Sequence, residues 1–227
     1  TGRYLLDLFV RTIANGETSN LYGRLVDSRT RELELGVSSV FSWLDSDPGQ
    51  PLFVGLANLD PKMAGDEMVG RVRDLVLDEI REVASLPAGS PELAEFNARV
   101  RNLLLEARRG SRSLLNSPPR FGYRGTYSDW IRQLQVLRHE GFRRNLALVE
   151  PALAVEAVLA GADNPWSRLV GEWRLLDVPY AVVTTPDPGM LEREEAERKE
   201  RIARCIEDPK SRYGVTEEAA AIARYRD

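Results

Sequence analysis

The sequence contains one cysteine, Cys205, and one histidine, His139. A lone cysteine excludes a disulfide framework and a thiolate metal cluster within the chain, and it leaves the redox compartment open. A lone histidine can act as a single metal ligand or a general base, but a partly exposed position at a helix end is the favoured interpretation. No run of about 18 apolar residues is present, so the sequence predicts no membrane-spanning helix.

The sequence also has no large excess of one sign of charge and no nucleotide-binding motif. The 31 basic and 35 acidic residues are spread along the chain, so its net charge of -4 calls for no nucleic-acid partner. A basic stretch at residues 108–112 precedes Phe121 and Tyr123, but nearby acidic residues and the lack of an RNA-binding motif disfavour a nucleic-acid patch. The sequence has no P-loop, G-x-S-x-G or dinucleotide fingerprint, so we expect no cofactor bound by this chain alone.

Apolar residues at the helical period dominate what is present. Ser90 is expected to cap a helix that begins at Pro91. Trp130, Trp166 and Trp173 are expected to pack helices against a sheet. The predicted helices cover residues 3–15, from Thr18 or Ser19 to near Ser28, 65–86, from Pro91 past Ala107, from Ser128 to near Gly141, about 150–160, 164–176, and a charged stretch from Met190 onward.

Three segments rich in β-branched and aromatic residues predict strands. Residues 37–45 and 51–60 flank a turn-rich stretch and predict an antiparallel hairpin, and residues 180–185 predict a strand around which the core closes. The expected fold class is α+β, with helices covering a two-layer antiparallel sheet. Three strands are few for such a fold, so we expect further strands before Thr1, in a chain cut at its N-terminus, or in irregular stretches.

Composition predicts two parts, an αβ domain over residues 1–186 and a charged helical linker over residues 187–227. The linker carries several glutamates between Glu192 and Glu200 that could form a carboxylate metal cluster. They alternate with arginines and lysines at i,i+3 and i,i+4 spacings, which favours a solvated helix. We therefore expect no metal in this segment.

Phe41 and Trp43 are the candidate site residues, because they fall on one side of the alternating strand 37–45. A free strand edge offers unpaired backbone groups to which an extended peptide can add. We therefore take Phe41 and Trp43 as candidate peptide contacts. Ordinary packing in the core is the favoured alternative for both side chains.

Residues 19–28, SNLYGRLVDS, resemble the S-x-L-y-x-x-L-v-d-s helix of the insulinase and pitrilysin-type zinc metallopeptidases. Residues 50–56 and the helical apolar positions between Val69 and Ile80 look like the strand and helix that follow in that family. Residues 177–183 and residues 191–225 are similar to the segment that joins the two halves of the four-domain members. The resemblance covers most of the chain.

The resemblance implies a clamshell of two homologous halves, each made of two αβ domains, around an enclosed chamber. The first domain of such proteins carries H-x-x-E-H, whose histidines and a distal glutamate hold zinc. Here His139 is followed by Glu140 and Gly141, and no second histidine exists, so this chain cannot assemble the zinc ligands. It is most similar to the non-catalytic second domain of the N-terminal half, followed by the start of the linker between the halves.

The sequence therefore predicts an inactive peptidase-like domain that forms part of a peptide-binding chamber. Its expected partners are a catalytic peptidase domain, in the same or a partner chain, and peptide substrates. Zinc is expected in that catalytic domain if the parent protein is active. One alternative is a structural or assembly module of a catalytically dead relative, and another is a helical adaptor in which residues 37–60 form no hairpin. The resemblance leaves the compartment open, with periplasm and cytoplasm both compatible.

Overall fold

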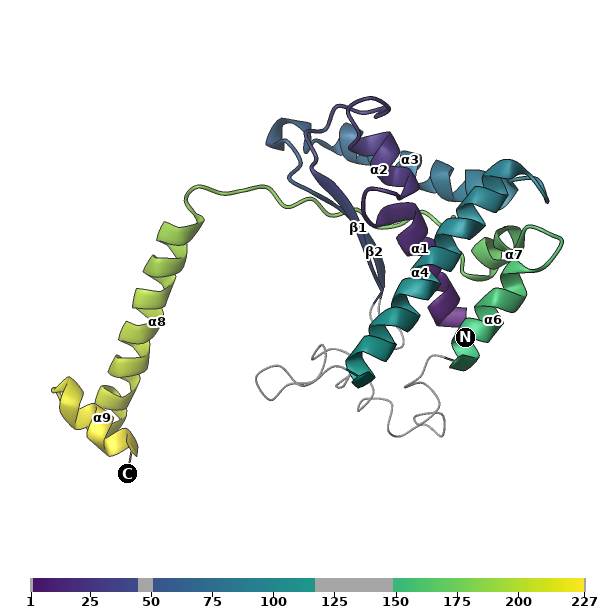
Figure 1. Ribbon diagram of the computed structural model, residues 1–227. Coiled ribbons are helices and arrows are strands. Elements are labelled where there is room, and N and C mark those ends of the chain that lie inside the picture. Colours follow the sequence, from purple (N-terminus) through teal and green to yellow (C-terminus); the bar gives the residue numbers. More distant parts are fainter. Residues whose placement is uncertain (1, 45–50, 117–148, 227) are drawn as a thin grey trace. The chain divides into compact units, whose positions relative to one another are not determined.

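The computed structural model describes residues 2–44, 51–116 and 149–226 (Figure 1). The chain divides into two compact units, one ending at Val183 and the other beginning at Thr184, close to the boundary predicted at 186/187. The elements of the described residues are α1 (Gly2–Ala14), α2 (Asn20–Leu25), β1 (Ser39–Leu44), β2 (Leu52–Ala57), a 3-10 turn (Pro61–Met63), α3 (Asp66–Ser85), α4 (Pro91–Asn116), α6 (Val149–Leu159), α7 (Pro165–Glu172), α8 (Met190–Tyr213) and α9 (Glu218–Arg226).

Helix α1 forms the centre of the first unit. Its stripe of Leu5, Phe9 and Ile13 recurs every four residues and is buried, as the sequence predicts. Helix α1 contacts α4, β1 and α2, while α2 also contacts β1 and α3. Figure 1 shows α1 between the hairpin of β1 and β2 and the long helix α4. The hydrophobic core therefore lies around α1, with the hairpin on one side and helices on the other.

An aromatic cluster occupies this core. The ring centroid of Phe9 lies 5.7 Å from Phe96, 4.9 Å from Trp166 and 6.0 Å from Trp173. Trp166 is fully buried, and its Nε1–H donates to Oδ1 of the buried Asn97 at 2.8 Å. The buried indole therefore has the hydrogen-bond partner that its desolvation requires. Core packing of Trp166 and Trp173 is confirmed, but their ring contacts are with helices rather than with the sheet that the sequence predicted. Trp130 lies outside the described residues.

Asn164 joins the end of α3 to the start of α7. Its side-chain oxygen accepts from the Trp166 backbone N–H at 2.9 Å, which caps α7. Its Nδ2 donates to the carbonyls of Val83, Ala84 and Leu86 at 2.9, 3.3 and 3.0 Å. One amide group thus satisfies orphan groups at a helix start and at a helix end.

A charged network fixes α2 against α3. Glu79 is only 4% exposed, and it accepts from Asn20 Nδ2 at 2.6 Å and from the Arg24 guanidinium at 3.0 Å. Arg24 also donates to Glu32 at 2.5 and 3.2 Å. These hydrogen bonds raise the pKa of Arg24, chiefly through Glu32, and hold the pKa of Glu32 below its usual value. The buried Glu79 carboxylate is therefore compensated by a guanidinium.

The expected helix ends are confirmed for most of the first unit. Ser90 Oγ accepts from the Leu93 backbone N–H at 3.2 Å at the start of α4, as predicted. Helix α2 ends at Leu25 rather than near Ser28, because the N–H groups of Val26 and Asp27 both donate to the Tyr22 carbonyl and turn the chain. The helix predicted from Ser128 to near Gly141 lies outside the described residues.

The strand predicted at residues 180–185 is wrong. These residues form no strand, and Tyr180 and Val182 are exposed to solvent. Within the described ranges the sheet has two strands, β1 and β2, and the core closes on helices without a third. The β-branched side chains of residues 180–185 favour extended backbone, but a strand also needs a neighbouring strand that accepts its backbone hydrogen bonds. Among the described residues, residues 180–185 have no such neighbour.

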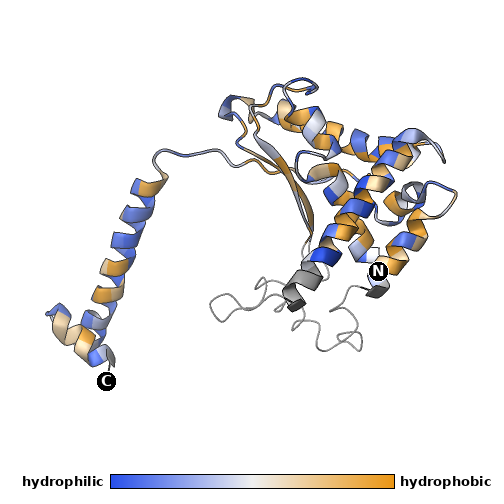
Figure 2. Ribbon diagram, in the orientation of Figure 1, coloured by the Kyte–Doolittle hydropathy of each residue, from blue (hydrophilic) through white to orange (hydrophobic). Residues whose placement is uncertain are grey.

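The second unit consists of α8 and α9, which contact each other. Gly214 ends α8 in the left-handed conformation with φ 62°, and its N–H donates to the carbonyls near the helix end. Figure 2 shows α8 as largely hydrophilic, in agreement with the charged helix predicted from Met190 onward. In the part of the chain that the structure describes, no helix has the length and apolar character needed to cross a bilayer.

Candidate peptide-contact surface

The hairpin is set by its alternating sequence and its register. Strands β1 and β2 pair antiparallel, with Trp43 opposite Phe53 and Phe41 opposite Gly55. Residues directly opposite each other in a sheet lie on the same face. Phe41, Trp43 and Phe53 therefore form one row, which we call the aromatic row.

The two faces of the hairpin lie in different environments. Val40 is 2% exposed, and Val54 and Leu56 pack against the core from the same face. On the opposite face the exposed fractions are 43% for Phe41, 59% for Trp43 and 53% for Phe53. Core packing, the favoured alternative for Phe41 and Trp43, is therefore wrong, because alternation turns both side chains away from α1.

Gly55 lies opposite Phe41 in the hairpin and makes room for its ring. A Cβ atom placed at Gly55 would lie 2.3 Å from Cζ of Phe41, well inside contact distance. The Phe41 ring therefore lies across the strand, directly over the Gly55 backbone. Only glycine leaves room for the ring in this position, a close approach that accounts for a glycine inside a strand.

Neither strand contains an ionisable side chain. The surface therefore offers apolar contact and backbone hydrogen bonding, and it has no group for proton transfer or metal coordination. Among the described residues no third strand pairs with β1 or β2, so each has an edge whose backbone groups are available. The base of the hairpin is fixed where Asn58 Nδ2 donates to Ser38 Oγ at 2.7 Å.

The sequence interpretation named Phe41 and Trp43 but missed Phe53 and Gly55. The signal was present in β2, where Phe53 and Gly55 alternate with Val54 and Leu56. Assigning them to the row required the register, which depends on the length of the connecting turn and not on either strand alone.

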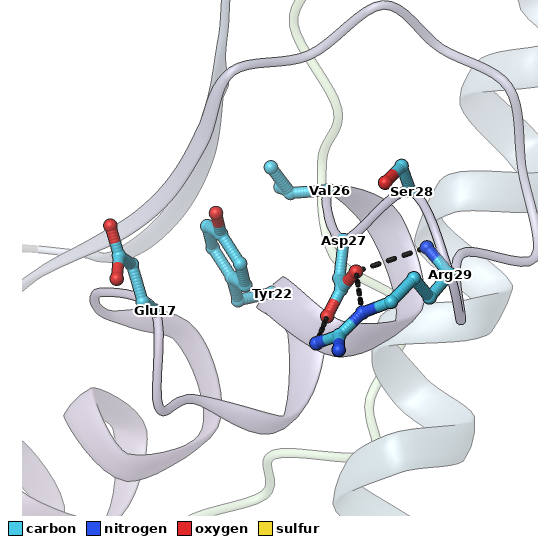
Figure 3. A pocket seen from close by; sticks show the side chains of 6 residues that line it. All are labelled: Glu17, Tyr22, Val26, Asp27, Ser28 and Arg29. Carbon is cyan, nitrogen blue, oxygen red and sulfur yellow. Dashed lines mark hydrogen bonds and ion pairs between the residues drawn. The ribbon is translucent and has the colours of Figure 1, made fainter.

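A second feature that the sequence did not suggest is an open depression at the end of α2 (Figure 3). It is lined by Glu17, Tyr22, Val26, Asp27, Ser28 and Arg29. Asp27 accepts from the Arg29 backbone N–H at 3.0 Å and from its guanidinium at 3.0 and 3.3 Å. These bonds lower the pKa of Asp27 and raise that of Arg29. Asp27 and Arg29 therefore satisfy each other's charge within this depression.

The remaining sequence candidates fall in different places. His139, Phe121 and Tyr123 lie outside the described residues. Arg108 lies beside Glu156, with 3.4 Å between the guanidinium and the carboxylate. Glutamates of α8 are exposed, and in the described ranges no group of three histidine, cysteine, aspartate or glutamate side chains is arranged to hold a metal.

Comparison of the chain with protein-family models, with curated proteins and with solved structures found no match. The resemblance to the insulinase-type metallopeptidases therefore stays a hypothesis that rests on the sequence patterns alone.

Proposed function

We propose that this chain is a non-catalytic domain of an insulinase-type zinc metallopeptidase, and that it contributes the aromatic row to a peptide-binding chamber formed with partner domains. The observation that supports the proposal is the exposure of Phe41, Trp43 and Phe53 together on an uncharged hairpin. Large apolar side chains gathered on a surface indicate a site of interaction. In this proposal zinc and the catalytic groups belong to another domain of the parent protein.

The contact proposed for the peptide is addition of an extended chain to the free edge of β1. Backbone hydrogen bonds to the strand edge would give affinity that does not depend on sequence. Alternate side chains of the peptide would then point toward Phe41 and Trp43, because side chains along a strand repeat every second residue. With no charged group on either strand, the surface favours peptides with bulky apolar residues at alternate positions.

A structural or assembly role is the second candidate, and the second unit provides the observation that favours it. Helices α8 and α9 expose a set of large apolar side chains: Met190, Leu191, Ile202, Tyr213, Ile222 and Tyr225. Such side chains on a charged helical pair are suited to packing against another protein subunit. This role needs no peptide at the aromatic row, so peptide binding separates the two candidates.

The test is binding of fluorescently labelled unstructured peptides to the full chain, measured by anisotropy. Replacing Trp43 by serine should weaken binding of a peptide with alternate apolar residues by roughly tenfold, because one large anchor is lost. The matched control is Tyr225→Ser, which removes an exposed aromatic side chain from α9 and should leave the affinity unchanged. Equal binding by the chain and its Trp43→Ser variant would contradict the contact role of the aromatic row.

A second measurement tests the parent protein. The full-length protein should carry H-x-x-E-H upstream of this chain and cleave unstructured peptides in a chelator-sensitive manner, and Trp43→Ser should raise KM more than it lowers kcat. No motif and no cleavage would favour the structural role. Peptide binding without cleavage would keep the contact role and reject the active parent.

A further inference from the structure

Residues 180–183, Tyr-Ala-Val-Val, are an exposed apolar segment between Pro179 and Pro186. They make no backbone hydrogen bond among the described residues. Aromatic and β-branched residues of this kind favour extended backbone. The two prolines lack an N–H, so strand pairing of this segment is confined to the residues between them. The segment has the composition of a strand and lacks the partner that a strand needs.

The hairpin provides the complementary feature in the same compact unit. Strand β2 is hydrogen-bonded to β1 along one of its two edges. Within the described ranges no other strand pairs with β2. An open, uncharged strand edge of this kind is a template for another chain.

We propose that residues 180–183 of one copy of this chain add to the edge of β2 in a second copy, and that the exchange is reciprocal. Each copy holds one donor segment and one acceptor edge, so a twofold arrangement satisfies both at once. The donor comes from another copy because, within its own unit, the segment leaves the hairpin unpaired. This inference goes beyond the proposed function and does not rest on it.

The chemistry of the two segments suits this pairing. Neither β2 nor residues 180–183 contain Asp, Glu, Lys, Arg or His, so the contact buries no carboxylate, ammonium, guanidinium or imidazole group. Tyr180 and Val182 alternate along the donor and would lie on one face beside Phe53, which extends the aromatic row across the dimer. Exposed apolar side chains of both copies would leave solvent together.

The test is the oligomeric state of the full chain by sedimentation velocity, from about 1 to about 100 µM, where dimers of micromolar affinity become populated. We expect a concentration-dependent dimer. Val182→Glu should raise its dissociation constant by up to about fivefold, because it replaces the apolar side chain that would lie beside Phe53 with a carboxylate. Val182 is 89% exposed in the single chain, so the variant should fold normally.

Phe53→Lys should weaken the dimer in the same way, and the double variant with Val182→Glu should recover affinity, because the two charges would meet across the copies. The matched control is Leu191→Glu on α8, which places the same carboxylate on a side chain that is 74% exposed. It should leave the dimer unchanged.

Three results would overturn the proposal. They are a monomer at every concentration, a dimer that is indifferent to Val182→Glu, and a dimer that Leu191→Glu weakens as much as Val182→Glu does. A monomer is also the result expected if residues 180–183 pair with the hairpin of their own chain.

Discussion

Phe9, Phe96 and Trp166 lie in the core, whereas Phe41, Trp43 and Phe53 lie on the open face of the hairpin. The core group comes from three helices whose apolar stripes converge, so each ring is surrounded by other side chains. On the hairpin, alternation sends every second side chain away from the core. Aromatic residues at those positions are exposed and contribute little to folding, which is the basis of the contact proposed above.

The largest effect should come from removing the buried indole. Trp166→Ala should lower the free energy of unfolding by about 3–5 kcal/mol, because it leaves a large cavity between α1, α4 and α7. Denaturant unfolding followed by circular dichroism measures the change. A loss below about 1 kcal/mol would show that the core closes over the cavity and would remove the contrast with the aromatic row.

A smaller effect should come from the hydrogen bond inside the cluster. Asn97→Ala leaves the Trp166 Nε1–H buried without its acceptor and should cost about 1–3 kcal/mol in the free energy of unfolding. The control is Trp166→Phe, which removes the donor. In that background Asn97→Ala should cost much less, and a double-mutant cycle by denaturant unfolding measures the coupling.

Substitution of Gly55, which lies beneath the Phe41 ring, tests the geometry of the aromatic row. Gly55→Ala forces the Phe41 ring off the strand into solvent, and because the ring is free to move there, stability should change by no more than about 1 kcal/mol. Peptide affinity should fall if the ring position matters to binding. In a Phe41→Ser background the same substitution should leave peptide affinity unchanged, and anisotropy titration of the four proteins checks both statements.

The smallest effect on stability should come from Trp43. Trp43→Ser should change the free energy of unfolding by no more than about 0.5 kcal/mol, because the side chain is mostly exposed. Denaturant unfolding of Trp43→Ser and Trp166→Ala, measured together, compares the aromatic row with the core cluster directly. A loss above about 2 kcal/mol would mean that Trp43 supports the fold, and the exposed row would then lose its distinction from the core cluster.

Local pattern made the helices and the hairpin predictable, because periodicity is encoded within each segment. Alternation also placed Phe41 and Trp43 on one face correctly. It could not decide which face would be open, because that depends on where α1 packs. Residues 180–185 failed for the opposite reason, since strand propensity was read without a partner strand.

The long-range polar contacts were beyond reach from the sequence. The role of Asn164 as a cap for α7 could be anticipated from its position before Pro165. The hydrogen bonds from Asn164 to Val83, Ala84 and Leu86 could not be anticipated, because the sequence separations are 81, 80 and 78 residues. The same holds for the Trp166–Asn97 hydrogen bond and for the burial of Glu79.

The Asn164 contacts have a consequence for synthesis of the chain. A protein leaves the ribosome from its N-terminus, so α3 emerges long before the amide that completes its last turn. Until Asn164 follows, the carbonyls of Val83, Ala84 and Leu86 lack its amide, Val83 keeps only the long bond from the Leu86 N–H at 3.4 Å, and the last turn of α3 should fray. The first unit should therefore become resistant to protease in nascent chains only after α7 has cleared the exit tunnel.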